Sequence, residues 1–266
     1  MVGLKNGAFI KVAKQEKDAR KYFHKAGIVD LTQITTIDLS EFIKEDFNKS
    51  AAQTKVYTIK KDDESIIGKL NESSTKPKKP LYLVESNSAH HISYFLAKKA
   101  FGEPNGKTRL VINFDQHEDY GNNSVFNCGT WGSHLKVKYQ ADYFVYGLKQ
   151  GNGIVCKLNN NSEHKKDVAE LLNGYAEIYI TIDMDVFAGT QNQQRTNWPN
   201  GNVKSICEVI NLINSLKKEK IIAADIHGLP IDSCISNQQR KNLSSEIEQY
   251  LKDISDLATV LDSKLP

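Results

Sequence analysis

The sequence predicts an α/β protein with a mostly parallel central sheet that helices cover on both faces. Three observations predict this class. Apolar runs of strand length recur along the chain, helical patterns separate several of them, and the runs are apolar at successive positions. Strands that are buried on both faces have this continuous apolar character, and strands that alternate with helices form parallel sheets.

The first part of the chain, residues 1–75, is expected to supply auxiliary elements. Residues 16–26 have helical spacing, and a second short helix is expected at residues 40–47 because a capping serine precedes an apolar face. Residues 56–59 alternate like a short strand, and residues 71–80 form a polar link with proline and lysine.

The rest of the chain is expected to form the core of the fold. The expected strands are residues 81–84, 109–114, 143–148, 177–182 and 221–224. The expected helices are residues 92–101, 163–172, 203–216 and 243–261. No linker divides the chain, so we expect one domain over residues 1–266, with the functional core in residues 80–266.

Composition excludes several other classes. Of the 266 residues, 39% are hydrophobic and 25% are charged, which excludes a disordered or collagen-like chain. A net charge of +3 is too small to predict nucleic-acid binding. No apolar run approaches the roughly 20 residues of a membrane helix, and the N-terminus has no apolar core of signal-peptide length, so a cytoplasmic protein with no membrane partner is expected. The 4 cysteines form no CxxC pair and are expected to be reduced.

Carboxylate and imidazole side chains follow three of the expected strands. Ligands bind beyond the carboxyl ends of parallel strands, so these positions are candidates for a site. They are His90 and His91, Asp115, His117 and Asp119, and Asp183 and Asp185. Without compensation, these groups would cost several kcal/mol in mutual repulsion and lost hydration. A pair of divalent cations would compensate them.

The chemistry of this set predicts manganese. The donors are mostly carboxylate oxygens with imidazole and no thiolate, which favours Mn²⁺ over structural zinc. Two such ions about 3.5–4 Å apart lower the pKa of a water between them to near neutrality. The implied reaction is hydrolysis at an electrophilic carbon.

These residues resemble the motifs of the arginase–deacetylase superfamily. Asp115-Gln116-His117-Glu118-Asp119 is similar to its Asp-Ala-His-x-Asp motif, and Thr181-Ile182-Asp183-Met184-Asp185 to its Ser-x-Asp-x-Asp motif. The upstream histidine pair is similar to its Gly-Gly-Asp-His motif. The resemblance covers about residues 80–230 and implies a three-layer α/β/α fold with two Mn²⁺ per chain.

The resemblance also implies roles for single residues. The implied metal ligands are His91 (or His90), Asp115, His117, Asp119, Asp183 and Asp185. Asp119 would in addition hydrogen-bond the hydroxide between the metals. The deacetylases of the superfamily hold one zinc with fewer ligands, so the full set is closer to the ureohydrolase branch.

Only one of the two adjacent histidines is expected to be a ligand. The spacing back to Asp115 is similar to that in arginases and favours His91. Helix register agrees, since Ile92 and Phe95 would then face the sheet while His91 opens the helix. His90 would be a neighbour of the ligand.

The substrate pocket departs from the arginase pattern. The glutamate with which arginases bind the guanidinium is replaced by Gly228, in the run Asp225-Ile226-His227-Gly228. The loop of the arginase proton shuttle is similar to a segment with Cys128 in the histidine position, and His134 is the candidate to replace that histidine. Free arginine is therefore not the expected substrate.

The chain looks like the peptide arginases of ribosomal peptide biosynthesis clusters. It shares both Asp motifs and the run His91-Ile92-Ser93-Tyr94-Phe95 with them. The resemblance implies that arginine side chains of a precursor peptide are converted to ornithine with release of urea. The candidate substrate-binding residues are Asp225, Glu118, Glu85, His227 and Trp198, the last in the polar loop 191–201.

Two other hypotheses remain open. One is a ureohydrolase that acts on a small guanidine such as agmatine. The other is a homologue that binds metal or peptide without catalysis, which the missing glutamate and Cys128 would fit. Apart from the precursor peptide, the resemblance allows a homo-oligomer, because arginases often assemble as trimers or hexamers.

Overall fold

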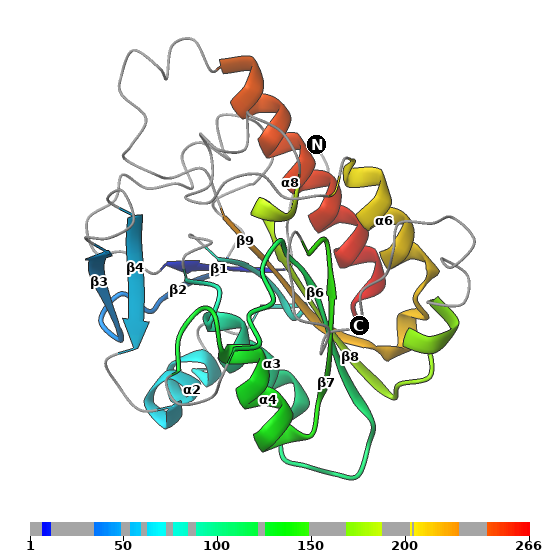
Figure 1. The fold of residues 1–266 in the computed structure, drawn as a ribbon, viewed down its shortest axis with the longest axis horizontal. Helices are drawn as coiled ribbons and strands as arrows, with labels where there is room; N and C mark the ends of the chain where they lie inside the picture. Colours follow the sequence, from blue (N-terminus) through cyan, green and yellow to red (C-terminus); the bar gives the residue numbers. More distant parts are fainter. Residues whose placement is uncertain are drawn as a thin grey trace.

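The centre of the molecule is a seven-stranded parallel sheet (Figure 1). A computed structural model describes residues 7–11, 35–48, 54–59, 63–72, 77–84, 89–121, 126–148, 169–187, 203, 205–228 and 244–266. The strand order is β2-β1-β5-β9-β8-β6-β7, and every pair in it is parallel. The strands are β1 (Ala8–Lys11), β2 (Thr35–Asp38), β5 (Leu81–Val84), β6 (Arg109–Phe114), β7 (Asp142–Tyr146), β8 (Glu177–Asp183) and β9 (Ile221–His227).

Helices cover both faces of this sheet, which confirms the three-layer α/β/α prediction. On one face lie α2 (Asp63–Asn71), α3 (Ile92–Phe101) and α4 (Trp131–Tyr139), and on the other α6 (Ile206–Ser215) and α8 (Ser244–Lys264) (Figure 1). Helix α3 packs on β8 and β9, and α4 packs on β7. Helix α8 packs on β5 and β9 and against α6.

The sheet is apolar because both of its faces are buried. Along β8, Ile178, Ile180 and Ile182 join the cluster that α6 and α8 complete, whereas Tyr179 belongs to the cluster of α3 and α4. Successive side chains of a strand point to opposite faces, so a central strand needs apolar residues at every position. This requirement made the core strands recognisable in the sequence.

The five predicted core strands and helices α3, α6 and α8 are all present. Their ends differ by a few residues from the prediction, most importantly at β9, which continues beyond residue 224 to His227. Of the predicted helix 163–172, residues 163–168 lie outside the described residues and residues 169–172 are helical.

The N-terminal part contributes more to the sheet than the sequence predicted. Strand β1 lies between β2 and β5, with Ala8 opposite Tyr82, so this part is integral rather than auxiliary. Helix α2 occupies residues before the predicted link and ends at its first residue, Asn71. The predicted helix 16–26 lies outside the described residues.

The predicted helix at residues 40–47 is wrong. Residues 43–48 form β3 (Ile43–Asn48), which pairs antiparallel with β4 (Thr54–Ile59) in a separate two-stranded sheet (Figure 1). The amide of Ser40 donates a hydrogen bond to Asp38 Oδ1 at 2.9 Å. This Asx-type turn redirects the chain where we expected a helix cap. Within the described ranges, none of the helices is both long and apolar enough to cross a membrane.

Candidate metal centre

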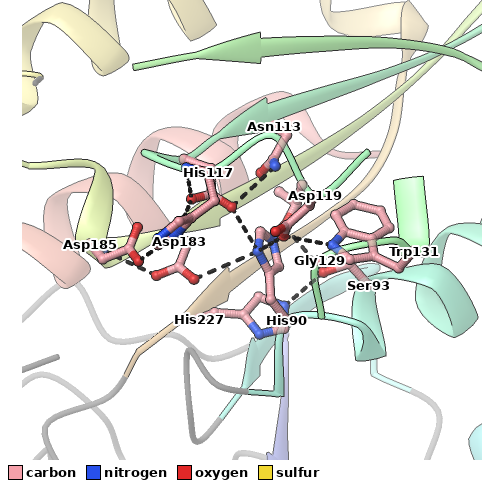
Figure 2. A network of polar contacts seen from close by, with 12 residues as sticks. His90, Ser93, Asn113, His117, Asp119, Gly129, Trp131, Asp183, Asp185 and His227 are labelled. Atoms are coloured by element: carbon pink, nitrogen blue, oxygen red, sulfur yellow. Dashed lines mark hydrogen bonds and ion pairs between the residues drawn. The ribbon is translucent and has the colours of Figure 1, made fainter. Parts of the chain in front are cut away.

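A pocket of about 340 Å³ opens at the carboxyl ends of β6 and β8, beside the start of α3. Among the described residues its lining is acidic. The lining residues are His90, Asp115, His117, Glu118, Asp119, Gly121, Cys128, Gly129, Asp183 and Asp185. Figure 2 shows the imidazoles and carboxylates of this group converging from separate elements.

Two turns of the same kind place the acidic motifs. Asp115 Oδ1 accepts a hydrogen bond from the His117 amide at 2.7 Å, directly after β6. Asp183 Oδ1 accepts from the Asp185 amide at 3.0 Å, directly after β8. Such Asx turns fold the third residue of the motif back beside the first. The Asp-x-His and Asp-x-Asp patterns therefore present both of their side chains to one point.

Asp119 is held in place by its backbone and by a tryptophan. Its φ of 47° lies in the left-handed region, which aspartate tolerates better than most residues. Its carbonyl accepts from the Gly132 amide at 3.0 Å, and Trp131 Nε1 donates to Asp119 Oδ2 at 2.8 Å. Strained backbone of this kind clusters at functional sites. Trp131 is fully buried, and its indole N–H anchors the Asp119 carboxylate.

Three groups of the described residues could each hold a metal ion: His90 with Asp225 and His227, which do not line the pocket, and two groups whose members all line it. The first of the two pocket groups surrounds His90. Its Nδ1 lies 3.0 Å from Asp115 Oδ2 and 2.9 Å from Asp119 Oδ2. Asp183 Oδ2 lies 3.6 Å from the same nitrogen. His90, Asp115 and Asp119 offer ligand atoms that all lie within 4.8 Å of one another.

The second group adjoins the first through Asp115. His117 Nδ1 lies 3.2 Å from Asp115 Oδ1 and 3.3 Å from Asp185 Oδ2. The His117 side chain is 43% exposed, whereas Asp185 is buried. Asp115, His117 and Asp185 again satisfy the distance requirement for a common ion. Asp115 is therefore the side chain that both groups share.

Crowded carboxylates and imidazoles shift one another's pKa. Burial opposes protonation of His90, but hydrogen bonds to Asp115 and Asp119 raise its pKa well above the ordinary value. In the same way, a hydrogen bond to Asp115 and the nearby carboxylate of Asp185 raise the pKa of His117 to about 11 against the effect of burial. Burial and the charge of Asp115 raise the pKa of Asp185 to about 6.

The other two aspartates follow the same direction. Burial and the charges of Asp185 and Asp115 raise the pKa of Asp183 well above its ordinary value, and burial with the charge of Asp115 raises that of Asp119. Only for Asp115 do the hydrogen bonds from His117 and His90 outweigh burial and lower the pKa. Protons thus partly neutralise the cluster when no cation is bound.

The donor set fits divalent cations. Both carboxylate oxygens of Asp185 are buried and accept no hydrogen bond of good geometry from the described residues. A buried carboxylate without donors is costly unless a cation compensates it. Carboxylate oxygens with imidazole nitrogens and no thiolate suit Mn²⁺. The two groups together could hold two such ions.

The structure corrects the choice between the adjacent histidines. His90, not His91, points at the carboxylates. His91 is fully buried, its ring stands edge-on to Phe126 at 5.9 Å, and neither of its nitrogens has a partner among the described residues. Burial and the charges of His227 and His90 lower its pKa to about 3. Helix register could not decide this, because all of the first six residues of α3 are buried.

Three of the predicted substrate or shuttle residues do not line the pocket. Asp225 and His227 are fully buried and do not line the pocket, since β9 continues through both. His134 is half-buried on α4 with its ring 5.2 Å from Phe126, and it does not line the pocket either. Glu118 does line it. Trp198 lies outside the described residues, as does Glu85.

Cys128 lines the pocket where the arginase resemblance placed a histidine. Burial and the charge of Asp119 raise the pKa of its thiol to about 11. Nucleophilic cysteines act as thiolates, so Cys128 is neutral at pH 7 and is not suited to covalent catalysis. The sequence also gave no role to Asn113, which donates from Nδ2 to Asp115 Oδ2 at 3.2 Å and to the Tyr143 hydroxyl at 2.8 Å.

Solved structures with the same fold share this architecture along nearly the whole chain. They include an arginase from Entamoeba histolytica in complex with L-ornithine, with a TM-score of 0.58 and 13% identity over 97% of this chain and 98% of that chain. A formimidoylglutamase from Bacillus subtilis has a TM-score of 0.60 and 15% identity over 96% and 86%. An arginase from Medicago truncatula has a TM-score of 0.60 and 12% identity over 100% and 88%.

These likenesses define the fold as the arginase-like α/β fold. Sequence identities of 12–15% establish the fold but not the reaction or the substrate. No family model matches the sequence, and no curated protein matches it. The assignment of a reaction therefore rests on the residues of the site.

Mn²⁺ is expected to raise the Tm of the metal-free protein, and the gain should grow from about pH 6 to about pH 8. The pKa values of His90 and His117 are raised in the folded protein, so both imidazoles stay protonated above pH 6.5. In the unfolded chain, histidines have a pKa of about 6.5 and are neutral in that range. Metal-free stability therefore falls as pH rises above about 6.5. Mn²⁺ needs deprotonated ligands, so its binding strengthens over the same range.

At a free concentration of about 100 times Kd, bound Mn²⁺ would stabilise the fold by about 2.7 kcal/mol, roughly 5–10 °C in a domain of this size. Differential scanning calorimetry with and without Mn²⁺, reversed by a chelator, measures the gain. A gain that is independent of pH would contradict the assignment of the two imidazoles as ligands.

Proposed function

We propose that the protein is a binuclear manganese hydrolase that converts arginine side chains of a ribosomally made precursor peptide to ornithine with release of urea. The observation that carries this proposal is the convergence of two imidazoles and four aspartates on one pocket, with Asp115 common to both groups. The arginase-like fold supports it.

The protein residues divide into ligands and their supports. One Mn²⁺ would be held by His90, Asp115 and Asp119, and the other by Asp115, His117 and Asp185. When bound, the ions would supply a hydroxide nucleophile near neutral pH and stabilise developing negative charge. Trp131 orients the Asp119 carboxylate toward His90, so Asp119 can accept a hydrogen bond from the attacking water.

The charge of the pocket favours a cationic substrate. Two divalent ions would neutralise the four aspartates, which leaves Glu118 as a pocket carboxylate outside the ligand set. A carboxylate binds guanidinium through charge-assisted, bidentate hydrogen bonds. Glu118 is therefore the proposed guanidinium partner, in place of the glutamate that arginases carry where this chain has Gly228.

The same charge disfavours free arginine. An α-carboxylate close to Glu118 would be repelled, whereas an arginine within a peptide has none. Agmatine also lacks a carboxylate, so the pocket is equally consistent with a small guanidine. A metal-binding homologue without catalysis would keep the ligands and lose the reaction.

Urea release separates these possibilities. We expect the Mn²⁺-loaded protein to release urea from an arginine-containing peptide with a kcat/KM at least about 10-fold higher than from agmatine, which corresponds to about 1.4 kcal/mol of peptide contacts that agmatine cannot make. Free arginine should be a poorer substrate than the peptide by a larger factor, because its carboxylate is also repelled. Mass spectrometry of the peptide should show ornithine in place of arginine.

Each contrary outcome would point to a different function. Urea from agmatine alone would identify a small-guanidine ureohydrolase. Two bound Mn²⁺ without urea from any of the three substrates would contradict the hydrolase proposal. One tightly bound zinc would contradict the binuclear centre.

A further inference from the structure

A chain of buried polar side chains begins at His90 Nε2, the ring nitrogen opposite the one that faces the pocket carboxylates. Figure 2 labels two of its members, Ser93 and His227, beside His90. His90 Nε2 lies 2.9 Å from Thr181 Oγ1 on β8. Thr181 Oγ1 lies 3.2 Å from Ser93 Oγ on α3, and Ser93 Oγ lies 2.8 Å from His227 Nε2 on β9. His227 Nε2 lies 3.2 Å from Asp225 Oδ1. Ser93, Thr181, Asp225 and His227 are all 0% exposed.

The chain of hydrogen bonds ends at Asp225, which is its negatively charged acceptor. Its carboxylate accepts from the hydroxyls of Tyr179 and Thr181. The charge of His227, with the hydrogen bonds from His227, Thr181 and Tyr179, lowers the pKa of Asp225 even though burial opposes this. An ionised carboxylate can only accept hydrogen bonds, so each neighbour must donate toward it.

This requirement fixes the protons along the chain. The Thr181 hydroxyl donates to Asp225, and its oxygen then has two lone pairs left to accept from His90 Nε2 and from Ser93. The nearby carboxylate favours a proton on His227 Nε2, which donates to Ser93 Oγ and frees the Ser93 hydroxyl to donate to Thr181. With a metal bound, His90 would keep its proton on Nε2 and present a lone pair on Nδ1, the atom that faces the carboxylates.

We propose that His227 and Ser93 are positioning residues that hold the proton of His90 on Nε2 and so present its Nδ1 lone pair to the metal. The inference rests on the metal centre of the proposed function. A ligand histidine is commonly fixed in tautomer and ring orientation by a hydrogen bond at its other nitrogen, and loss of such a partner costs about 10–100-fold in metal affinity. The His227 ring also packs against the His90 ring, with centroids 4.6 Å apart.

The architecture gives this role to residues that no substrate can touch. Strand pairing places Asp225 opposite Thr181, and His227 opposite Asp183. His227 thus lies level with Asp183, and Asp225 one step further down the sheet, both on the face that α3 covers, and neither lines the pocket. The sequence had suggested both as substrate-binding residues; we infer that they act on the substrate only through the metal ligand.

The test measures the affinity of the His90 group for Mn²⁺ directly. In a His117→Ala background, which removes an imidazole from the other group, free Mn²⁺ is titrated by electron paramagnetic resonance. Addition of His227→Leu is expected to weaken the remaining Mn²⁺ site by about 10–100-fold. His227→Gln keeps an N–H donor near the Nε2 position and should restore most of the affinity. Ser93→Ala should produce a loss in the same direction as His227→Leu.

Ser133→Ala is the matched control. Its hydroxyl is buried and donates to the Thr130 carbonyl at 2.7 Å, and it contacts no proposed ligand, so the Mn²⁺ affinity should not change. Circular dichroism and the metal-free Tm establish that each variant folds. If His227→Leu does not fold, Ser93→Ala carries the test alone.

The outcomes separate this inference from the proposed function. An unchanged affinity in folded Ser93→Ala and His227→Leu would overturn the positioning role and leave the metal centre intact. An equal loss in His227→Gln and His227→Leu would also overturn it, because the retained donor would have no effect. If the unsubstituted protein binds no Mn²⁺, the metal centre and the proposed function fail together.

Discussion

Replacement of Asp115 by alanine is expected to reduce urea release from an arginine-containing peptide by at least about 10³-fold. Asp115 is the side chain shared by both groups, with Oδ2 3.0 Å from His90 Nδ1 and Oδ1 3.2 Å from His117 Nδ1. Its loss removes a ligand from each ion. Metal ions contribute several kcal/mol to such reactions, and each 1.36 kcal/mol is a factor of ten in rate. Urea release and bound manganese, counted by plasma emission spectrometry, should fall together.

Asp142→Asn is the control for this variant. Asp142 opens β7 at the amino ends of the strands, away from the site, and its carboxylate accepts from the Tyr175 hydroxyl at 2.8 Å. It should keep two Mn²⁺ per chain and full activity. Retention of two ions and of activity in Asp115→Ala would show that the metal centre lies elsewhere.

The two acidic motifs could be predicted from the sequence because local rules place them. Asp115 and Asp183 each follow an apolar strand and each accept a backbone hydrogen bond from the residue two positions later. This geometry involves no distant part of the chain. Strands β6 and β8 were equally recognisable, because burial on both faces gives a strand an apolar residue at nearly every position.

The errors arose where distant segments decide the structure. Strand β1 has only four residues and gains its place between β2 and β5, which follow it at a distance along the chain. Its sequence, Ala8 to Lys11, has no pattern long enough to predict this. Residues 43–48 likewise became a strand because residues 54–59 pair with them.

The end of β9 explains the error about the substrate pocket. The apolar run ends at residue 224, so Asp225 and His227 were expected to follow the strand as substrate-binding residues. In the structure both are strand residues, opposite Thr181 and Asp183. Their polar side chains are tolerated in the core because His227 hydrogen-bonds Ser93 and forms an ion pair with Asp225, which accepts a hydrogen bond from Tyr179. A strand that ends in buried polar residues cannot be delimited by hydropathy.

Replacement of Glu118 by glutamine is expected to lower kcat/KM for an arginine-containing peptide by about 10- to 100-fold, because a hydrogen bond to a charged group contributes about 1.5–3 kcal/mol. Glu118 lines the pocket but belongs to neither metal-binding group. Two Mn²⁺ should therefore remain bound, and the loss should fall mainly on KM if the carboxylate binds the guanidinium equally in the ground and transition states.

A citrulline-containing peptide distinguishes charge from shape in this experiment. Citrulline has nearly the shape of arginine but no positive charge, so its inhibition constant should change little between the unsubstituted protein and Glu118→Gln. Glu208→Gln is the matched control. Glu208 lies on α6, accepts a hydrogen bond from the Tyr146 hydroxyl at 3.1 Å and does not line the pocket.

An equal weakening of the binding of the arginine and citrulline peptides would show that Glu118 shapes the pocket rather than binding the guanidinium. Loss of a metal ion in Glu118→Gln would instead place Glu118 among the ligands, and the guanidinium partner would then have to come from another part of the chain.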